Sequence, residues 1–95
     1  MAQTLTHAVH MIARGRVQGV GFRFFVRDKA SRYGIKGWVR NRPDGSVEIH
    51  AEGQKELLDE FMAAVKEGPL FGRVSDIEGE QVEPTNEYTG FSIEF

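Results

Sequence analysis

The sequence contains no cysteine, which excludes disulfides, thiol chemistry and cysteine-based zinc sites. It has no apolar run near the roughly 20 residues that span a bilayer. The first residues, Met1 to Thr4, carry neither the basic nor the apolar region of a secretory signal. We therefore expect a cytoplasmic protein without a membrane partner. The length of 95 residues predicts a single domain over residues 1–95, because a chain of this size cannot support two cores.

Acidic residues are scarce in the first part of the chain and abundant in the second. Up to residue 42, nine lysines and arginines accompany one acidic residue, Asp28. From residue 43 onward, three basic residues accompany thirteen acidic ones. The basic part favours an anionic partner. The alternative is that the two parts interleave in the fold and their charges pair across the surface.

Glycines are concentrated in one segment, where Gly15, Gly19 and Gly21 fall within seven positions. This segment follows a predicted strand and precedes a predicted helix. Such a turn can aim successive backbone N–H groups at one point beside the positive end of the helix dipole, which suits a phosphate group. Arg23, near the start of the helix, offers a planar fork of donors for two phosphate oxygens. The alternative is a glycine-rich connector with a surface arginine.

Hydrophobic spacing predicts the remaining elements. We expect helices over 22–33 and 54–67, ended by Gly34 and by Gly68-Pro69, and a hairpin turn at Pro43-Asp44-Gly45. Strands are expected over 7–14, 36–42, 46–52, 74–82 and 91–95. The order βαββαβ(β) predicts an α+β fold, the ferredoxin-like sandwich, with two helices on one face of an antiparallel sheet of four to five strands. The expected order of the first four strands is 4-1-3-2.

The alternation of residues 46–52 places Glu48 and Glu52 on the solvent side of the sheet. His10 and His50 share this outer face on neighbouring strands. Because no third ligand stands beside them, we expect exposed histidines and no metal site. Along the last strand, Phe91, Ile93 and Phe95 are expected on one face.

The expected topology brings the glycine segment and Asn41 to the same edge of the sheet. The first two strands would run parallel with one strand between them, a gap of about 10 Å. Asn41 would share the helix-covered face with Val39, where a polar side chain needs a reason. Two interpretations stay open: Asn41 orients a water molecule near a bound phosphoryl group, or it caps the hairpin through its own backbone.

Three other phosphate or nucleic-acid motifs do not fit the glycine segment. No Lys-Ser/Thr follows the glycines, which excludes a Walker A loop, and Phe24 stands where a dinucleotide fingerprint needs a small residue. The segment from Gly21 to Val26 faintly resembles an RNA-binding motif, but its aromatic residues follow the spacing of a helix core. We therefore expect no nucleic-acid partner.

Two segments together resemble both signatures of the acylphosphatase family. The first is Gly15-Arg16-Val17-Gln18-Gly19-Val20-Gly21-Phe22-Arg23, and the second is Gly37-Trp38-Val39-Arg40-Asn41, followed by Gly45-Ser46-Val47 and Gly53. The resemblance covers nearly the whole chain. One departure is Ala13, where a larger aliphatic residue is expected.

The resemblance implies hydrolysis of acyl phosphates to a carboxylate and inorganic phosphate, without a cofactor or metal. By position, it implies that Arg23 and the amides of Gln18, Gly19, Val20, Gly21 and Phe22 bind the phosphoryl group, and that Asn41 orients the water. We expect a monomer whose ligands are a small acyl phosphate and inorganic phosphate. Two alternatives remain: a module that binds a phosphorylated ligand or nucleic acid without turnover, and a standalone relative of the acylphosphatase-like domains that handle carbamoyl phosphate in larger enzymes.

Overall fold

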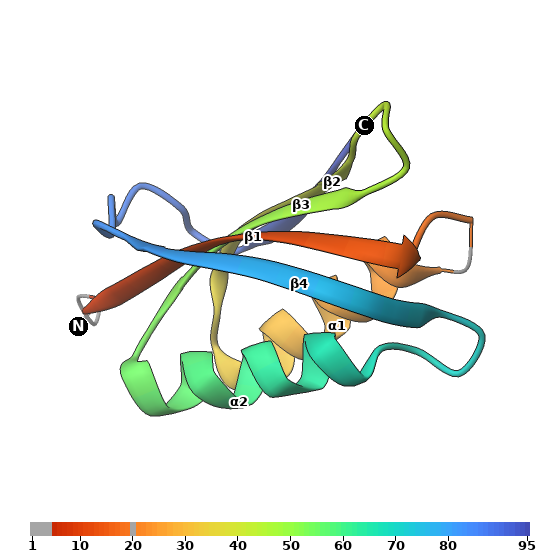
Figure 1. Ribbon diagram of the computed structural model, residues 1–95. Helices are drawn as coiled ribbons and strands as arrows, with labels where there is room; N and C mark the ends of the chain where they lie inside the picture. Colours follow the sequence, from red (N-terminus) through yellow and green to blue (C-terminus); the bar gives the residue numbers. More distant parts are fainter. Residues whose placement is uncertain (1–4, 20) are drawn as a thin grey trace.

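A five-stranded sheet with two helices on one of its faces makes up the fold (Figure 1). The computed structural model describes residues 5–19 and 21–95. The strands are β1 (His7–Arg16), β2 (Lys36–Asn41), β3 (Val47–Gly53), β4 (Arg73–Val82) and β5 (Phe91–Glu94). The helices are α1 (Phe22–Tyr33) and α2 (Lys55–Glu67). The predicted ferredoxin-like element order and both helices are therefore confirmed.

The sheet order is β4-β1-β3-β2-β5, so the predicted order of the first four strands is confirmed. These four strands pair antiparallel, whereas β5 pairs parallel to β2, which makes the sheet mixed rather than wholly antiparallel. β1 is also longer than predicted. After a bulge at Arg14/Gly15, Gly15 pairs with Val74 and Arg16 with Arg73, so the connection to α1 begins only at Val17.

The core lies between the sheet and the helices. β1 contributes Val9, Met11 and Ala13 to this core, and all three are buried. From α1, Phe22 and Val26 are fully buried against the sheet, as expected for a helix core rather than an RNA-binding face. Gly34 and Gly68 end the helices at the predicted places.

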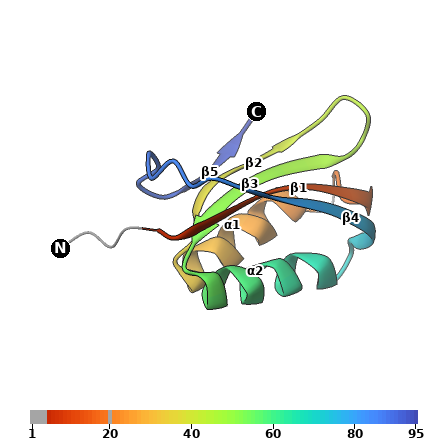
Figure 2. The same ribbon diagram turned by 60° about the vertical axis from the view of Figure 1, so that its left-hand side comes forward.

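The other face of the sheet is partly covered by residues 83–90, which join β4 to β5 across the sheet (Figure 2). This segment changes the environment that the sequence predicts for Glu52 and His50. The Glu52 side chain is 0% exposed and that of His50 only 13%, so neither is an exposed surface group. The His50 ring stacks on that of Trp38, with centroids 6.0 Å apart, and the Tyr88 ring is tilted against His50 at a centroid distance of 5.4 Å. Trp38 therefore packs against His50 on this face of the sheet.

Glu52 is held by four hydrogen-bonding groups. Oε2 accepts from the backbone N–H and the hydroxyl of Thr85, each at 3.0 Å, and lies 2.6 Å from His50 Nε2. Oε1 accepts from the backbone N–H of Asn86 at 2.9 Å. Burial alone raises the pKa of a carboxyl, but these hydrogen bonds outweigh it and hold the pKa of Glu52 below its ordinary value. The ionised carboxylate thus anchors the segment that leads into β5.

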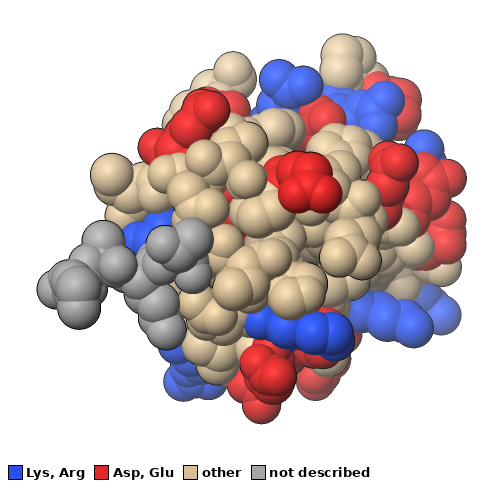
Figure 3. All heavy atoms as spheres, turned by 90° about the vertical axis from the view of Figure 1, so that its left-hand side faces the viewer, with Lys and Arg blue, Asp and Glu red and all other residues tan. Residues whose placement is uncertain are grey.

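The basic and acidic parts of the chain interleave in space. Arg14 Nη1 lies 2.9 Å from Glu78, and Arg40 Nε lies 2.7 Å from Glu48. Glu48 is itself only 15% exposed and contacts His10 at 2.6 Å, so it too is paired rather than simply hydrated. Blue and red groups lie side by side on the face drawn in Figure 3. Charge pairing therefore offsets part of the asymmetry along the sequence. None of the described helices is long and apolar enough to cross a membrane.

We predict that Glu52→Gln lowers the free energy of unfolding by about 2 kcal/mol, because one of the buried donors loses its acceptor. The depressed pKa adds a pH dependence. Wild-type stability from this group is fully present above pH 4.5, the ordinary pKa, and is lost as the pH falls through the lower folded-state pKa.

Urea unfolding at several pH values checks both statements. The variant should lose less stability between pH 6 and pH 3 than the wild type (on the order of the linkage expected for one carboxyl). Glu60→Gln, on the exposed side of α2, controls for the loss of one negative charge. Equal acid sensitivity of wild type and Glu52→Gln would contradict the assignment.

Candidate active site

The connection from β1 to α1 reverses the chain through two glycines in the left-handed region. Gly19 and Gly21 both have φ of 74°. Among the described residues other than the glycine and its chain neighbours, no atom lies within 4 Å of a Cβ added at either residue, so the backbone conformation, and not a lack of space, favours glycine there. Gly21 is also the N-cap of α1. Val20, which the resemblance assigns to phosphate binding, lies outside the described residues.

The first turn of α1 is suited to an anion. Its first intrahelical bond runs from Phe25 N–H to the Gly21 carbonyl at 3.0 Å, which leaves the preceding amides without a partner within the helix. This turn contains no acidic residue. The amides and the helix dipole therefore present partial positive charge to the space in front of α1.

Arg23 lies in this first turn and is fixed by the end of the chain. Its Nη1 donates to the Glu94 carbonyl at 3.2 Å, and its guanidinium carbon lies 4.7 Å from the centre of the Phe95 ring. β5 thus supplies a backbone acceptor and, just beyond its end, an aromatic ring. Phe91 and Ile93 pack against the core as expected, whereas Phe95 is 99% exposed.

Asn41 lies at the end of β2 and is exposed. Within residues 5–19 and 21–95 its side-chain amide makes no hydrogen bond, so it does not cap the hairpin. Other groups hold that turn: Gly45 N–H donates to the Arg42 carbonyl at 3.1 Å, and Ser46 N–H donates to the Asp44 carboxylate at 2.9 Å. The capping interpretation of Asn41 therefore finds no support in its contacts.

A small cavity brings most of the predicted residues together. Its volume is about 180 Å³, and it is lined by Val17, Gly19, Gly21, Phe22, Arg23, Phe24 and Asn41. Val17 and Phe24 also line this cavity, and the sequence did not predict them as site residues. The Phe24 ring is half exposed, which places an apolar group beside the cationic one. A space of this size suits a small anion better than a nucleotide.

Of the predicted residues that the structure describes, Gln18 is the exception. Its side-chain nitrogen donates to the carbonyls of Arg42 and Ser46, at 2.8 and 2.9 Å, and not toward the cavity. A role for Gln18 in phosphate binding can therefore come only from its backbone. The sequence shows that an amide side chain stands in the loop, and this is the only signal in it for the contacts that Gln18 makes with Arg42 and Ser46.

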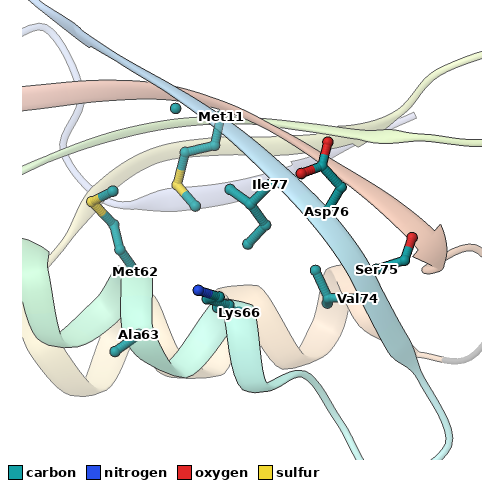
Figure 4. Close-up of a pocket in the computed structure, with 9 residues that line it drawn as sticks. Met11, Met62, Ala63, Lys66, Val74, Ser75, Asp76 and Ile77 are labelled. Atoms are coloured by element: carbon teal, nitrogen blue, oxygen red, sulfur yellow. The ribbon is translucent and has the colours of Figure 1, made fainter.

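A larger cavity, of about 470 Å³, lies between α2 and β4, away from the predicted residues. Met11, Met62 and Ile77 point into this space (Figure 4). Lys66 is the one cation among its lining residues, and no glycine loop contributes to it. It lacks the converging donors that phosphate binding requires. No group of three or more His, Asp or Glu side chains that could hold a metal occurs among the described residues.

The part of the chain that matches a known protein family includes this loop and the strands around it. Residues 9–93 match the Acylphosphatase family. The chain belongs to the acylphosphatase family. An acylphosphatase of Bacillus velezensis is 50% identical over 86 residues, which cover 90% of this chain and 96% of the relative.

Solved structures agree. The crystal structure of acylphosphatase from Bacillus subtilis superimposes with a TM-score of 0.90 at 44% identity, over 94% of this chain and 99% of that one. A crystal structure of full-length HypF in a phosphate- and nucleotide-bound form matches with a TM-score of 0.80 at 30% identity, over 100% of this chain but 13% of that one. The predicted family, its fold and its acylphosphatase activity, a hydrolase activity, are thereby confirmed.

Within this acylphosphatase fold, we predict that Phe95→Leu weakens competitive inhibition by inorganic phosphate about two- to fivefold. The substitution keeps an apolar side chain but removes the ring beneath Arg23, and an exposed cation–π contact contributes about 0.5–1 kcal/mol. Phe95→Tyr keeps a ring and should leave the inhibition constant unchanged. Equal inhibition constants for Phe95→Leu and the wild type, from steady-state kinetics, would show that the ring does not help to orient Arg23.

Proposed function

We propose that the protein hydrolyses acyl phosphates in the cavity between the β1–α1 loop and Asn41. The backbone amides from Gln18 to Phe22 and the guanidinium of Arg23 bind the phosphoryl group. Asn41 orients the attacking water. The observation that supports this proposal is the arrangement of Gly19, Gly21, Arg23 and Asn41 around one cavity.

The chemistry of the substrate explains why so few groups suffice. The leaving group is a carboxylate, whose conjugate acid has a pKa of about 4–5, so no general acid is required. Phosphoryl transfer asks the protein mainly for positioning and for stabilisation of charge on the phosphoryl oxygens. Amide dipoles and Arg23 supply both, so the proposed reaction uses no cofactor.

The proposed reaction also uses no protein base. No His, Asp or Glu is present among the described lining residues of the cavity. The proton of the attacking water therefore passes to an oxygen of the substrate's own phosphoryl group. The bond between phosphorus and the acyl oxygen breaks as the bond from water oxygen to phosphorus forms, which yields inorganic phosphate and the carboxylate.

The remaining parts of the proposal concern the setting of this reaction. We propose that residues 1–95 act as one domain, as a monomer in the cytoplasm, with a small acyl phosphate as substrate and inorganic phosphate as product and competitive ligand. Nucleic acid is not part of this proposal. The buried Phe22 supports that choice, because an RNA-binding sheet would present such an aromatic residue to solvent.

The direct test is phosphate release from acetyl phosphate in excess EDTA. We expect full turnover, since the proposed site relies on amides and a guanidinium. Loss of turnover under the chelator would instead indicate a metal-dependent reaction. Phosphate-competitive binding without turnover would indicate a binding module.

Arg23→Ala and Asn41→Ala should have different kinetic effects. Removing Arg23 deletes a charge-assisted, two-pronged contact, so we expect kcat to fall and the phosphate inhibition constant to rise together, the latter about 10- to 100-fold. Arg23→Lys keeps the charge without the planar pair of donors and should recover only part of the loss.

Asn41→Ala should lower kcat about 100-fold while the phosphate inhibition constant changes little. Steady-state kinetics with acetyl phosphate checks both, and a large rise of the inhibition constant in Asn41→Ala would contradict the role given to Asn41.

A further inference from the structure

The side chain of Gln18 ties the phosphate-binding loop to the turn between β2 and β3. Its Nε2 donates to the Arg42 carbonyl at 2.8 Å and to the Ser46 carbonyl at 2.9 Å. Residues 42 and 46 are the two ends of that turn, since Arg42 N–H donates to the Ser46 carbonyl at 2.9 Å. Gln18 therefore hydrogen-bonds to Arg42 and Ser46, the two residues whose own hydrogen bond closes the turn.

The chemistry of these contacts fixes the orientation of the Gln18 amide. Carbonyl oxygens only accept hydrogen bonds, so the NH₂ group, and not the amide oxygen, must face them. An amide NH₂ has two protons, and both are used here. The side chain thus has no donor left for a phosphoryl oxygen, and its function in the loop must be a different one.

Among the residues that the structure describes, Gln18 alone links the loop to the turn by hydrogen bonds. Within the described residues, the two bonds of Gln18 are the only hydrogen bonds between the loop residues 17–21 and the turn residues 42–46. The bonds of Asp44 with Ser46 and of Gly45 with Arg42 hold the turn together internally but do not connect it to the loop.

Asn41 directly precedes Arg42, the first of the two residues that Gln18 contacts. Its side chain is exposed and makes no hydrogen bond within the described residues, so its position depends on the backbone around it. That backbone is held by pairing with β3 on one side and by the Gln18 contact with Arg42 on the other. A shift of the turn relative to the loop would move the Asn41 amide relative to a bound phosphoryl group.

We infer that Gln18 is a positioning residue for acyl phosphate hydrolysis, which holds the β2–β3 turn against the loop and so fixes Asn41 relative to the phosphoryl group. This inference rests on the proposed function, in which Asn41 orients the water. Gln18 acts through Asn41 and not on the phosphoryl group. A purely structural role would change stability, whereas the positioning role changes kcat through one particular partner.

The test is a double-mutant cycle on kcat with acetyl phosphate, at a temperature where circular dichroism shows every variant to be folded. Gln18→Met keeps the length of the side chain and removes both donors. Alone, it should lower kcat about 10-fold, because small displacements of a positioned group are costly. The phosphate inhibition constant should stay within about twofold of the wild type. In an Asn41→Ala background, Gln18→Met should change kcat by less than about twofold, since the group that it positions is absent.

Two further variants complete the experiment. Gln18→Asn keeps the amide but is one methylene too short to reach both carbonyls, so it should show the same loss of kcat with less disturbance of packing. Gln81→Met, on the exposed part of β4, is the matched control and should leave kcat unchanged.

The outcomes separate this inference from the proposed function. An equal fold-loss from Gln18→Met with and without Asn41 would overturn the inference while the proposed function stands. Wild-type kcat in both Gln18→Met and Gln18→Asn would overturn it as well. Wild-type kcat in Asn41→Ala would overturn the proposed role of Asn41 and, with it, the inference. Loss of kcat confined to the background that contains Asn41, with phosphate inhibition intact, is the result that we expect.

Discussion

The antiparallel pairing of β3 with both β1 and β2 is the constraint on which the rest of the structure depends. Because both neighbours run opposite to β3, they run parallel to each other, and their carboxyl ends lie at one edge of the sheet. One of these ends continues into the loop before α1, and the other carries Asn41. Val47, Ile49 and Ala51 hold β3 in place through full burial. Burial of one strand thus determines where two distant segments meet.

The face of the sheet opposite the helices contributes to the site indirectly. Glu52 anchors residues 85 and 86, which belong to the segment that crosses from β4 to β5. β5 then pairs with β2 and brings the Glu94 carbonyl to Arg23. A buried carboxylate on the far side of the sheet therefore holds the segment that leads to the strand contacting the guanidinium. Such a group is expensive to desolvate and is tolerated because each of its oxygens is hydrogen-bonded.

The element order and the core were predictable from the sequence because they follow from local signals, and the grouping of the candidate site was predictable from the expected strand topology. Alternating residues mark β3, and the positions of Gly19 and Gly21 mark a turn before a helix. The burial of Glu52 and His50 was not predictable, since it depends on residues 83–90, which have no hydrophobic period and cross the sheet by way of distant pairings. The side-chain contact of Gln18 was missed for the same reason: its acceptors are backbone carbonyls 24 and 28 residues away. Sequence patterns report the side of an element that faces the core, not what an irregular segment covers.

The site that we propose, made of main-chain N–H groups and Arg23, has a consequence for its response to acidity. Amides do not titrate in water near neutrality, and arginine is not deprotonated in proteins. The carboxamide of Asn41 is equally inert. A site of this composition keeps one charge state from mildly acidic to mildly alkaline solution. Over that pH range, any change in the affinity of this site for a phosphoryl compound comes from a change in the protonation of the compound and not of the site.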